Sequence, residues 1–151
     1  MNMEMTDLER FIAAQEGGCP GCGTYAEALE EMRNGQKQTH WIWYVLPQLR
    51  GLGRSEYARF FGLADLAEAR AYLAHPVLGA RLRETAEALL GLETDDPQRV
   101  MNGHTDARKL RSSMTLFDMA SPEDVFGRVL EKYFGGSRDE NTLALTAEGQ
   151  M

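Results

Sequence analysis

The chain has 151 residues, of which 43% are hydrophobic and 26% charged, a globular composition that excludes wholesale disorder. Its 16 Lys and Arg against 23 Asp and Glu residues give a formal net charge of −7, which argues against long nucleic acid as a partner. A local basic pocket for one small anion is still compatible with this balance. No apolar run approaches the roughly 20 residues of a membrane span, and the first residues lack signal-peptide features. We therefore expect a cytoplasmic protein without a membrane partner.

The first half of the chain predicts helices separated by glycine and proline breaks. A capping-box pattern at Thr6 and Glu9 opens the first helix, and a glycine pair at 17–18 ends it. A second helix starts near Thr24 and ends at Asn34. The run 41–46 is apolar on every side, and no convincing second strand is found, so we interpret it as a buried helix turn or an extended core segment.

The second half continues the helical pattern. Ser55 is expected to cap the helix that follows it, and the pair Asp65 and Glu68 the next one. Thr105 or Asp106 is the expected cap of the segment 106–120, and Ser121-Pro122 opens a helix that ends at the glycines 135–136. A last short helix is expected at 138–146, followed by a loose tail at 147–151. We predict an all-α, compact single-domain bundle of about six or seven short helices over residues 1–151, with its core at about 6–145.

Three motifs in order give the chain a family resemblance: GQKQTHWIWYVLPQLRGLGRS, AEARAYLAHPVLGARLRE and DARKLRSSMTLF. They resemble the bacterial family called domain of unknown function 1810, sometimes mislabelled calpastatin, over roughly residues 6–145. The usual wording of the first motif is nearer to HWMWFIFPQ; Ile42, Tyr44 and Leu46 replace apolar members here, and no polar member is lost. Phe61 stands where a tyrosine is usual. The resemblance implies membership of the family and little about activity.

The first motif gathers the side chains of a candidate ligand site: Lys37, His40, Trp41, Trp43 and Gln48. The indoles can stack on a planar ring, Lys37 can neutralise a phosphate or carboxylate, and Gln48 offers a donor and an acceptor. His40 is a candidate general base near neutral pH. The alternative is that both tryptophans are core anchors, with His40 and Gln48 satisfying backbone groups near Pro47.

The third motif contributes a second candidate set on one helical face, Asp106, Lys109 and Ser113, at positions i, i+3 and i+7. A lysine beside a serine can activate a nucleophile, as in Ser-Lys hydrolases. The alternative is a surface ion pair beside tolerated serines. If both motifs face one cavity, Lys37 and Lys109 give it two positive charges in an acidic protein. As ligand-binding cations they should be replaceable by alanine with nearly unchanged folding stability.

Cys19 and Cys22 lie in a CPGC segment outside the family pattern. Reduced thiols fit a cytoplasmic protein. Two thiolates are half of a structural zinc site, which His104 or a second chain would have to complete. Redox chemistry and an inert loop with free or oxidised thiols are the alternatives. His75, just before a proline-initiated helix, is expected to be structural, capping or packing at the helix junction.

These patterns lead to a functional hypothesis with an alternative. The first is a small-molecule site for a planar anionic, nucleotide-like ligand, with hydrolysis or group transfer as the reaction class if the protein is an enzyme. The second is a non-catalytic binding module or adaptor, in which the aromatic motif is core or a partner groove. A concave pocket with perturbed titratable groups favours an enzyme, and an exposed apolar patch favours an adaptor.

Overall fold

The computed structural model describes the backbone of residues 3–18 and 22–149, and the side chains of residues 8–18 and 22–147. This part of the chain contains ten helices and no strand, only the isolated bridges Cys22–His40 and Leu49–Leu63. The helices are α1 (Met3–Gly17), α2 (Tyr25–Arg33), α3 (Ile42–Val45), α4 (Glu56–Phe61), α5 (Leu66–Ala74), α6 (Leu78–Leu90), α7 (Pro97–Met101), α8 (His104–Ala120), α9 (Val125–Phe134) and α10 (Glu140–Gly149).

The all-α prediction is confirmed, but the predicted number of helices is wrong. Three of the ten helices have only four to six residues: α3, α4 and α7. A segment of one turn or slightly more shows no helical periodicity, because the pattern needs at least two turns to repeat. The apolar run at 41–46 is the clearest case, since it contains the buried turn α3.

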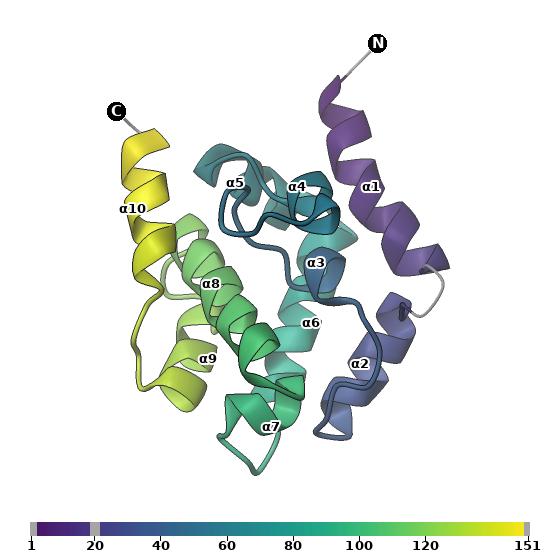
Figure 1. The fold of residues 1–151 in the computed structure, drawn as a ribbon, viewed down its shortest axis with the longest axis vertical. Helices are drawn as coiled ribbons and strands as arrows, with labels where there is room; N and C mark the ends of the chain where they lie inside the picture. Colours follow the sequence, from purple (N-terminus) through teal and green to yellow (C-terminus); the bar gives the residue numbers. More distant parts are fainter. Residues whose placement is uncertain (1–2, 19–21, 150–151) are drawn as a thin grey trace.

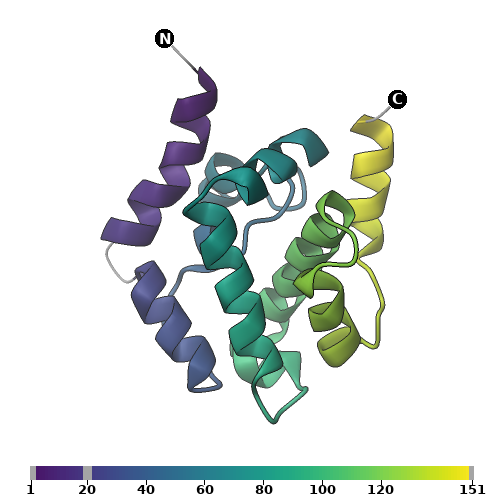
Figure 2. The same cartoon turned by 180° about the vertical axis from the view of Figure 1, so that it is seen from behind.

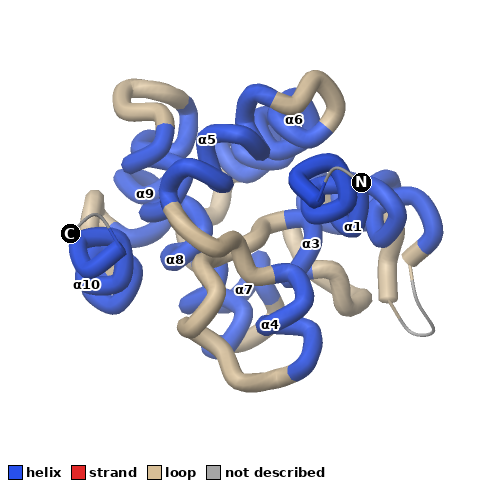
Figure 3. The backbone as a smooth tube through the Cα atoms, turned by 90° about the horizontal axis from the view of Figure 1, so that it is seen from above, coloured by secondary structure: helices blue, strands red, loops and turns tan. Residues whose placement is uncertain are grey.

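Helix α8 lies at the centre of the molecule and packs against α5, α7, α9 and α10 (Figure 1). Seen from behind, α6 runs between α2 and α9 (Figure 2), which are the helices it contacts. The view from above places α1 and α10 on opposite flanks of this arrangement (Figure 3). Among the described residues no helix combines the length and hydrophobicity that a bilayer crossing requires.

Several predicted helix starts are confirmed by side-chain caps. Thr24 forms a capping box with Glu27, Ser55 accepts from the backbone N–H of Ala58, and Asp65 accepts from that of Glu68. Each such bond satisfies a backbone donor that the first turn leaves unpaired. These local rules therefore worked where the cap and the helix are adjacent in sequence.

Other predicted boundaries are wrong. Helix α1 begins at Met3, so Thr6 lies inside it. Helix α8 begins at His104. The residue before it, Gly103, has a φ of 139° and makes no side-chain cap, so Thr105 and Asp106 lie in the first turn of the helix. Helix α9 begins at Val125 with Asp124 as its cap, to which Ser121 donates a hydrogen bond.

At the other end of the chain, α10 runs to Gly149 and so passes residue 146, where we expected the last helix to end. Residues 150–151 of the expected tail lie outside the described part of the chain.

Candidate small-molecule site

The two candidate motifs meet at Asp106. Its Oδ2 atom lies 2.9 Å from Lys37 Nζ, and its Oδ1 atom lies 3.6 Å from Lys109 Nζ. Lys37 comes from the loop after α2, whereas Asp106 and Lys109 lie in the first turns of α8. One carboxylate therefore pairs with both lysines, and the lysines sit on either side of it.

Lys37 is an interior residue. Its side chain is 5% exposed, and its ammonium lies 5.1 Å from the centre of the Trp41 ring. Its backbone N–H donates to Val100 O at 2.7 Å, and its carbonyl accepts from Asn102 Nδ2 at 3.1 Å. Helix α7 thus holds Lys37 in place from the backbone, and the ammonium serves as a buried counter-ion for Asp106.

Trp41 is fully buried, and its indole N–H donates to Glu31 Oε1 at 2.9 Å. The same carboxylate accepts from the backbone N–H groups of Gln38 and Thr39 and from the Thr39 hydroxyl. Partial burial raises the pKa of Glu31, but these hydrogen bonds outweigh it and hold the pKa below its ordinary value. Glu31 therefore ties the loop at 36–41 to α2, and Trp41 belongs to the core.

A pocket of about 190 Å³ opens beside Lys109. Three segments line it: the glycine loop after α3, one face of α8, and the start of α10. The lining residues are Gln48, Leu52, Gly53, Thr105, Arg108, Lys109, Ser112, Asp139 and Asn141. Two of the predicted ligand residues, Gln48 and Lys109, are thus brought together although they are far apart in the sequence.

Sequence reasoning missed the other pocket residues of α8. Thr105, Arg108, Lys109 and Ser112 occupy positions i, i+3, i+4 and i+7 of the helix. That spacing is one helical face, and all four side chains are polar. A search of α8 for a polar face, rather than for pairs around a serine, would have found them.

The charges around the pocket favour an anion. Arg108 and Lys109 both line it, and Asp139 is the one acidic residue among the described residues of its lining. The Asp139 carboxylate accepts hydrogen bonds from the backbone N–H and the hydroxyl of Thr142, so it is engaged in the first turn of α10. Lys109 is held from two sides, by Asp106 and by the ring of Trp43 at 4.9 Å.

Trp43 does not line the pocket, but its ring contacts Lys109 and an aromatic surface on α4. It is partly buried, and its ring centre lies 5.0 Å from that of Tyr57. Tyr57 is 46% exposed and Phe60 is 57% exposed. Large aromatic side chains with this exposure offer a flat contact surface, and Trp43 contacts both Tyr57 and Lys109.

The two candidate reactive groups do not line the pocket. His40 is exposed, and its carbonyl accepts from Tyr44 OH at 3.1 Å and from Gly23 N at 3.4 Å. Ser113 is fully buried, and its Oγ atom has no hydrogen-bond partner among the described residues. The Ser–Lys hydrogen bond on which nucleophile activation depends is therefore not formed in this structure.

Cys22 is disulfide-bonded, which corrects our expectation of a reduced thiol at this position. A disulfide sulfur is not a thiolate ligand, so a zinc site that uses Cys22 first requires reduction of this bond. Cys19 lies outside the described residues. Within the described part of the chain, no three His, Cys, Asp or Glu side chains are grouped to hold a metal ion.

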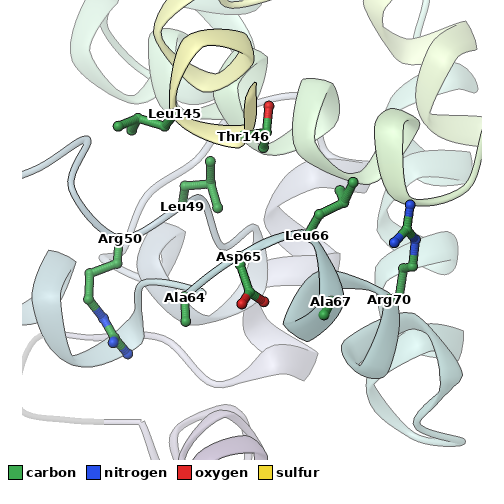
Figure 4. Close-up of a pocket in the computed structure, with 9 residues that line it drawn as sticks. All are labelled: Leu49, Arg50, Ala64, Asp65, Leu66, Ala67, Arg70, Leu145 and Thr146. Atoms are coloured by element: carbon green, nitrogen blue, oxygen red, sulfur yellow. The ribbon is translucent and has the colours of Figure 1, made fainter. Parts of the chain in front are cut away.

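A second cavity of about 260 Å³ lies between the chain at Leu49, the start of α5 and the inner face of α10. Figure 4 shows Arg50 and Arg70 at opposite ends of it. The Arg50 guanidinium donates to Gly62 O at 3.1 Å, and the Thr146 hydroxyl donates to backbone carbonyls within α10. Since these polar groups already have protein partners, we do not assign a ligand to this cavity.

Comparison with known proteins places the chain in a family. The family model described as "Protein of unknown function (DUF1810)" matches residues 5–146. The crystal structure of the conserved hypothetical protein Rv1873 from Mycobacterium tuberculosis is similar, with 42% sequence identity and a TM-score of 0.86 over 93% of this chain and 96% of that one. No curated protein matches the chain. The resemblance seen in the three sequence motifs is therefore confirmed, and the chain belongs to the DUF1810 family of proteins of unknown function.

Proposed function

We propose that the protein binds a small planar anion, such as a nucleotide fragment, in the pocket beside Lys109. The observation that carries the proposal is the placement of Lys109, which lines the pocket and is held between Asp106 and the ring of Trp43. A cation fixed in this way loses little conformational entropy when an anion binds, which favours affinity. Arg108 supplies a second positive charge, and Gln48 and Asn141 supply amide donors.

The aromatic side chains around Trp43 are the reason for proposing a planar ligand. The Trp43 ring lies 4.9 Å from the Lys109 ammonium and 5.0 Å from the Tyr57 ring, and the exposed Tyr57 ring gives a ring attached to the anion a surface to stack on outside the pocket. Lys37 and Trp41, which we first assigned to the ligand directly, take supporting roles in this proposal. Lys37 holds Asp106, and Asp106 in turn orients Lys109.

Binding, rather than catalysis, is the function that we propose. Hydrolysis or group transfer needs a reactive group at the ligand, and neither His40 nor Ser113 lines the pocket. Two carboxylates of the described residues have a lowered pKa, and both lie elsewhere. Glu31 lies beside Trp41, and at Asp124 hydrogen bonds from Arg83, Val125 and Ser121 outweigh the effect of burial. The cytoplasmic location stays a prediction, and a disulfide is more typical of oxidising compartments.

Calorimetric titration of the protein with AMP and with inorganic phosphate tests the proposal. We expect both to bind, AMP more tightly, and Lys109→Ala to weaken both about tenfold or more, since a charge-assisted contact is lost. Arg128→Ala is the matched control, because it removes a positive charge from an exposed pair with Glu87 outside the pocket. Absence of binding, or equal effects of the two variants, would contradict the proposal.

An adaptor is the second candidate function, and the exposure of Tyr57 and Phe60 on α4 favours it. A surface of this kind can serve a protein partner instead of a ligand ring. In that case both titrations stay blank, and Phe60→Ser abolishes capture of a partner that the wild-type protein retains. If the protein binds the ligands and Lys109→Ala weakens this binding, the result contradicts the adaptor function.

A further inference from the structure

Helix α4 presents two neighbouring aromatic rings to solvent at the edge of the molecule (Figure 3). The exposed large hydrophobic side chains of the described chain are Tyr57, Phe60 and Val77. The first two occupy positions i and i+3 of α4 and therefore share one face of it. An open hollow of about 520 Å³ lies on this face, lined by Glu56, Tyr57, Arg59, Phe60 and Phe61. An exposed aromatic face of this kind indicates a contact surface.

The two exposed rings are held from below by buried aromatic side chains. Phe61 is 7% exposed, and its ring centre lies 4.8 Å from that of Phe60 and 6.3 Å from that of Tyr57. Phe61 in turn contacts Tyr44 and Phe11 of the core, at 5.3 and 5.7 Å. Because the rings are already fixed, covering them costs little conformational entropy, which favours binding of a partner.

Glu56 and Arg59 lie beside the two rings, at positions i and i+3 of the same helix. Both side chains are exposed, and neither has an ion-pair or hydrogen-bond partner in the described part of the chain. The lining of the hollow therefore carries one charge of each sign. An acidic partner segment would be repelled by Glu56 and a basic one by Arg59, whereas a partner with both charges can pair with both.

We propose that this face binds a second copy of the chain, in a dimer whose two α4 helices run antiparallel about a two-fold axis. In this arrangement Tyr57 packs on the partner's Phe60, and Glu56 lies opposite the partner's Arg59. A two-fold interface uses the same surface of both copies, so the surface must complement itself. The two aromatic positions and the two opposite charges of α4 meet this requirement, and a surface with charges of one sign does not.

The inference goes beyond the proposed function and does not depend on it. Among the described residues, the hollow on α4 and the pocket beside Lys109 share no lining residue. A second copy on α4, unlike the partner of an adaptor, therefore leaves the ligand proposal standing. A face on one six-residue helix is small beside the roughly 1,600 Å² that a standard interface buries, so we expect a weak dimer that dissociates on dilution.

Sedimentation equilibrium over about a hundredfold range of protein concentration tests the inference. The samples contain no AMP, because its ring and the second copy would both cover Tyr57. We expect monomer at low and dimer at high concentration. Phe60→Ser should weaken the dimer about tenfold or more, because each copy loses an aromatic anchor. Val77→Ser is the matched control, since it removes an exposed hydrophobic side chain outside α4 and should leave the dimer unchanged.

Charge reversals test whether the partner is a second copy in this arrangement. Glu56→Arg and Arg59→Glu should each weaken the dimer about tenfold, because like charges then face each other twice across the two-fold axis. The variant with both changes should bind within about threefold of the wild type, since the pairs form again with their signs exchanged. The thermal midpoint of each variant should stay close to that of the wild type, because the replaced side chains are exposed.

A chain that stays monomeric at every concentration overturns the inference. A dimer that Phe60→Ser leaves intact, or that the double charge reversal fails to restore, overturns it as well. Lys109→Ala should leave the dimer unchanged while it weakens ligand binding. A dimer without AMP binding therefore contradicts the proposed function alone, and AMP binding by a strict monomer contradicts this inference alone.

Discussion

Lys37 and Lys109, to which the sequence assigned the same ligand-binding role, differ in burial. Both pair with Asp106, but the Lys37 side chain is 5% exposed and that of Lys109 is 23% exposed. The buried lysine cannot reach a ligand without leaving its carboxylate, and the other lines the pocket. Our expectation that both replacements leave stability unchanged is therefore revised for Lys37.

Lys37→Ala is expected to lower the free energy of unfolding by about 3 kcal/mol, because it leaves a partly buried carboxylate without its shorter ion pair. Urea unfolding at pH 7 measures the change. Arg128→Ala, which breaks a pair that is 68% and 63% exposed, should change the free energy by less than about 0.5 kcal/mol. Equal values for the two variants would show that the buried pair contributes little and would restore our first expectation.

At the scale of elements, the junction of α5 and α6 shows a sharp turn made by two residues. His75 Nδ1 accepts from the backbone N–H groups of Val77 and Leu78, at 3.1 and 3.3 Å, which confirms the structural role predicted for this histidine. Gly79 then lets α6 pass close to the end of α5, since a Cβ at this position would lie 2.1 Å from Leu73 O.

Gly79→Ala is expected to destabilise the protein by about 2–3 kcal/mol, because the added methyl group meets a backbone carbonyl that cannot rotate away. The thermal midpoint measures the effect. Gly91→Ala is the matched control, since Gly91 ends the same helix in an ordinary right-handed conformation and its Cβ would be 3.5 Å from the nearest atom. A midpoint as high in Gly79→Ala as in Gly91→Ala would refute the close contact.

At the scale of the whole molecule, phenol groups are buried in several separate elements. Burial raises the pKa values of Tyr44 and Tyr133 to about 12, and it also raises those of Tyr25 and Tyr72. Tyr133 OH, for example, donates to Leu89 O at 2.6 Å and joins α9 to α6. The folded state thus requires neutral phenols at several points of the core.

Alkaline unfolding follows from these tyrosines. An unfolded phenol ionises near pH 10.0, and the folded pKa values are higher, so the stabilisation is complete below about pH 10 and is lost as the pH rises towards 12. Urea unfolding at pH 8 and pH 11 measures the loss. Tyr133→Phe should lose less stability over this interval, since one ionisation is removed. A free energy of unfolding that does not change between pH 8 and pH 11 contradicts the prediction.

The all-α fold could be predicted from the sequence because helix signals are local. A capping side chain and the helix that it opens are a few residues apart, as at Thr24, Ser55 and Asp65. The starts of α8 and α9 could not be predicted as well, because Gly103 has no side-chain cap and Ser121 acts through Asp124. A four-residue helix such as α3 is too short to show helical periodicity in the sequence, and burial of its side chains stabilises it.

The sequence by itself determined the family, the helical class and the two motifs from which the candidate site is built. Only the tertiary structure decided that Asp106 joins the motifs, that Lys37 and Trp41 are interior, and that Gln48 and Lys109 share a pocket. The physical reason is that these outcomes depend on contacts that the loops before and after α3 make with α2, α7 and the first turns of α8. Hydrophobic and capping patterns specify each element along the chain, but packing between elements decides which side chains lose contact with water.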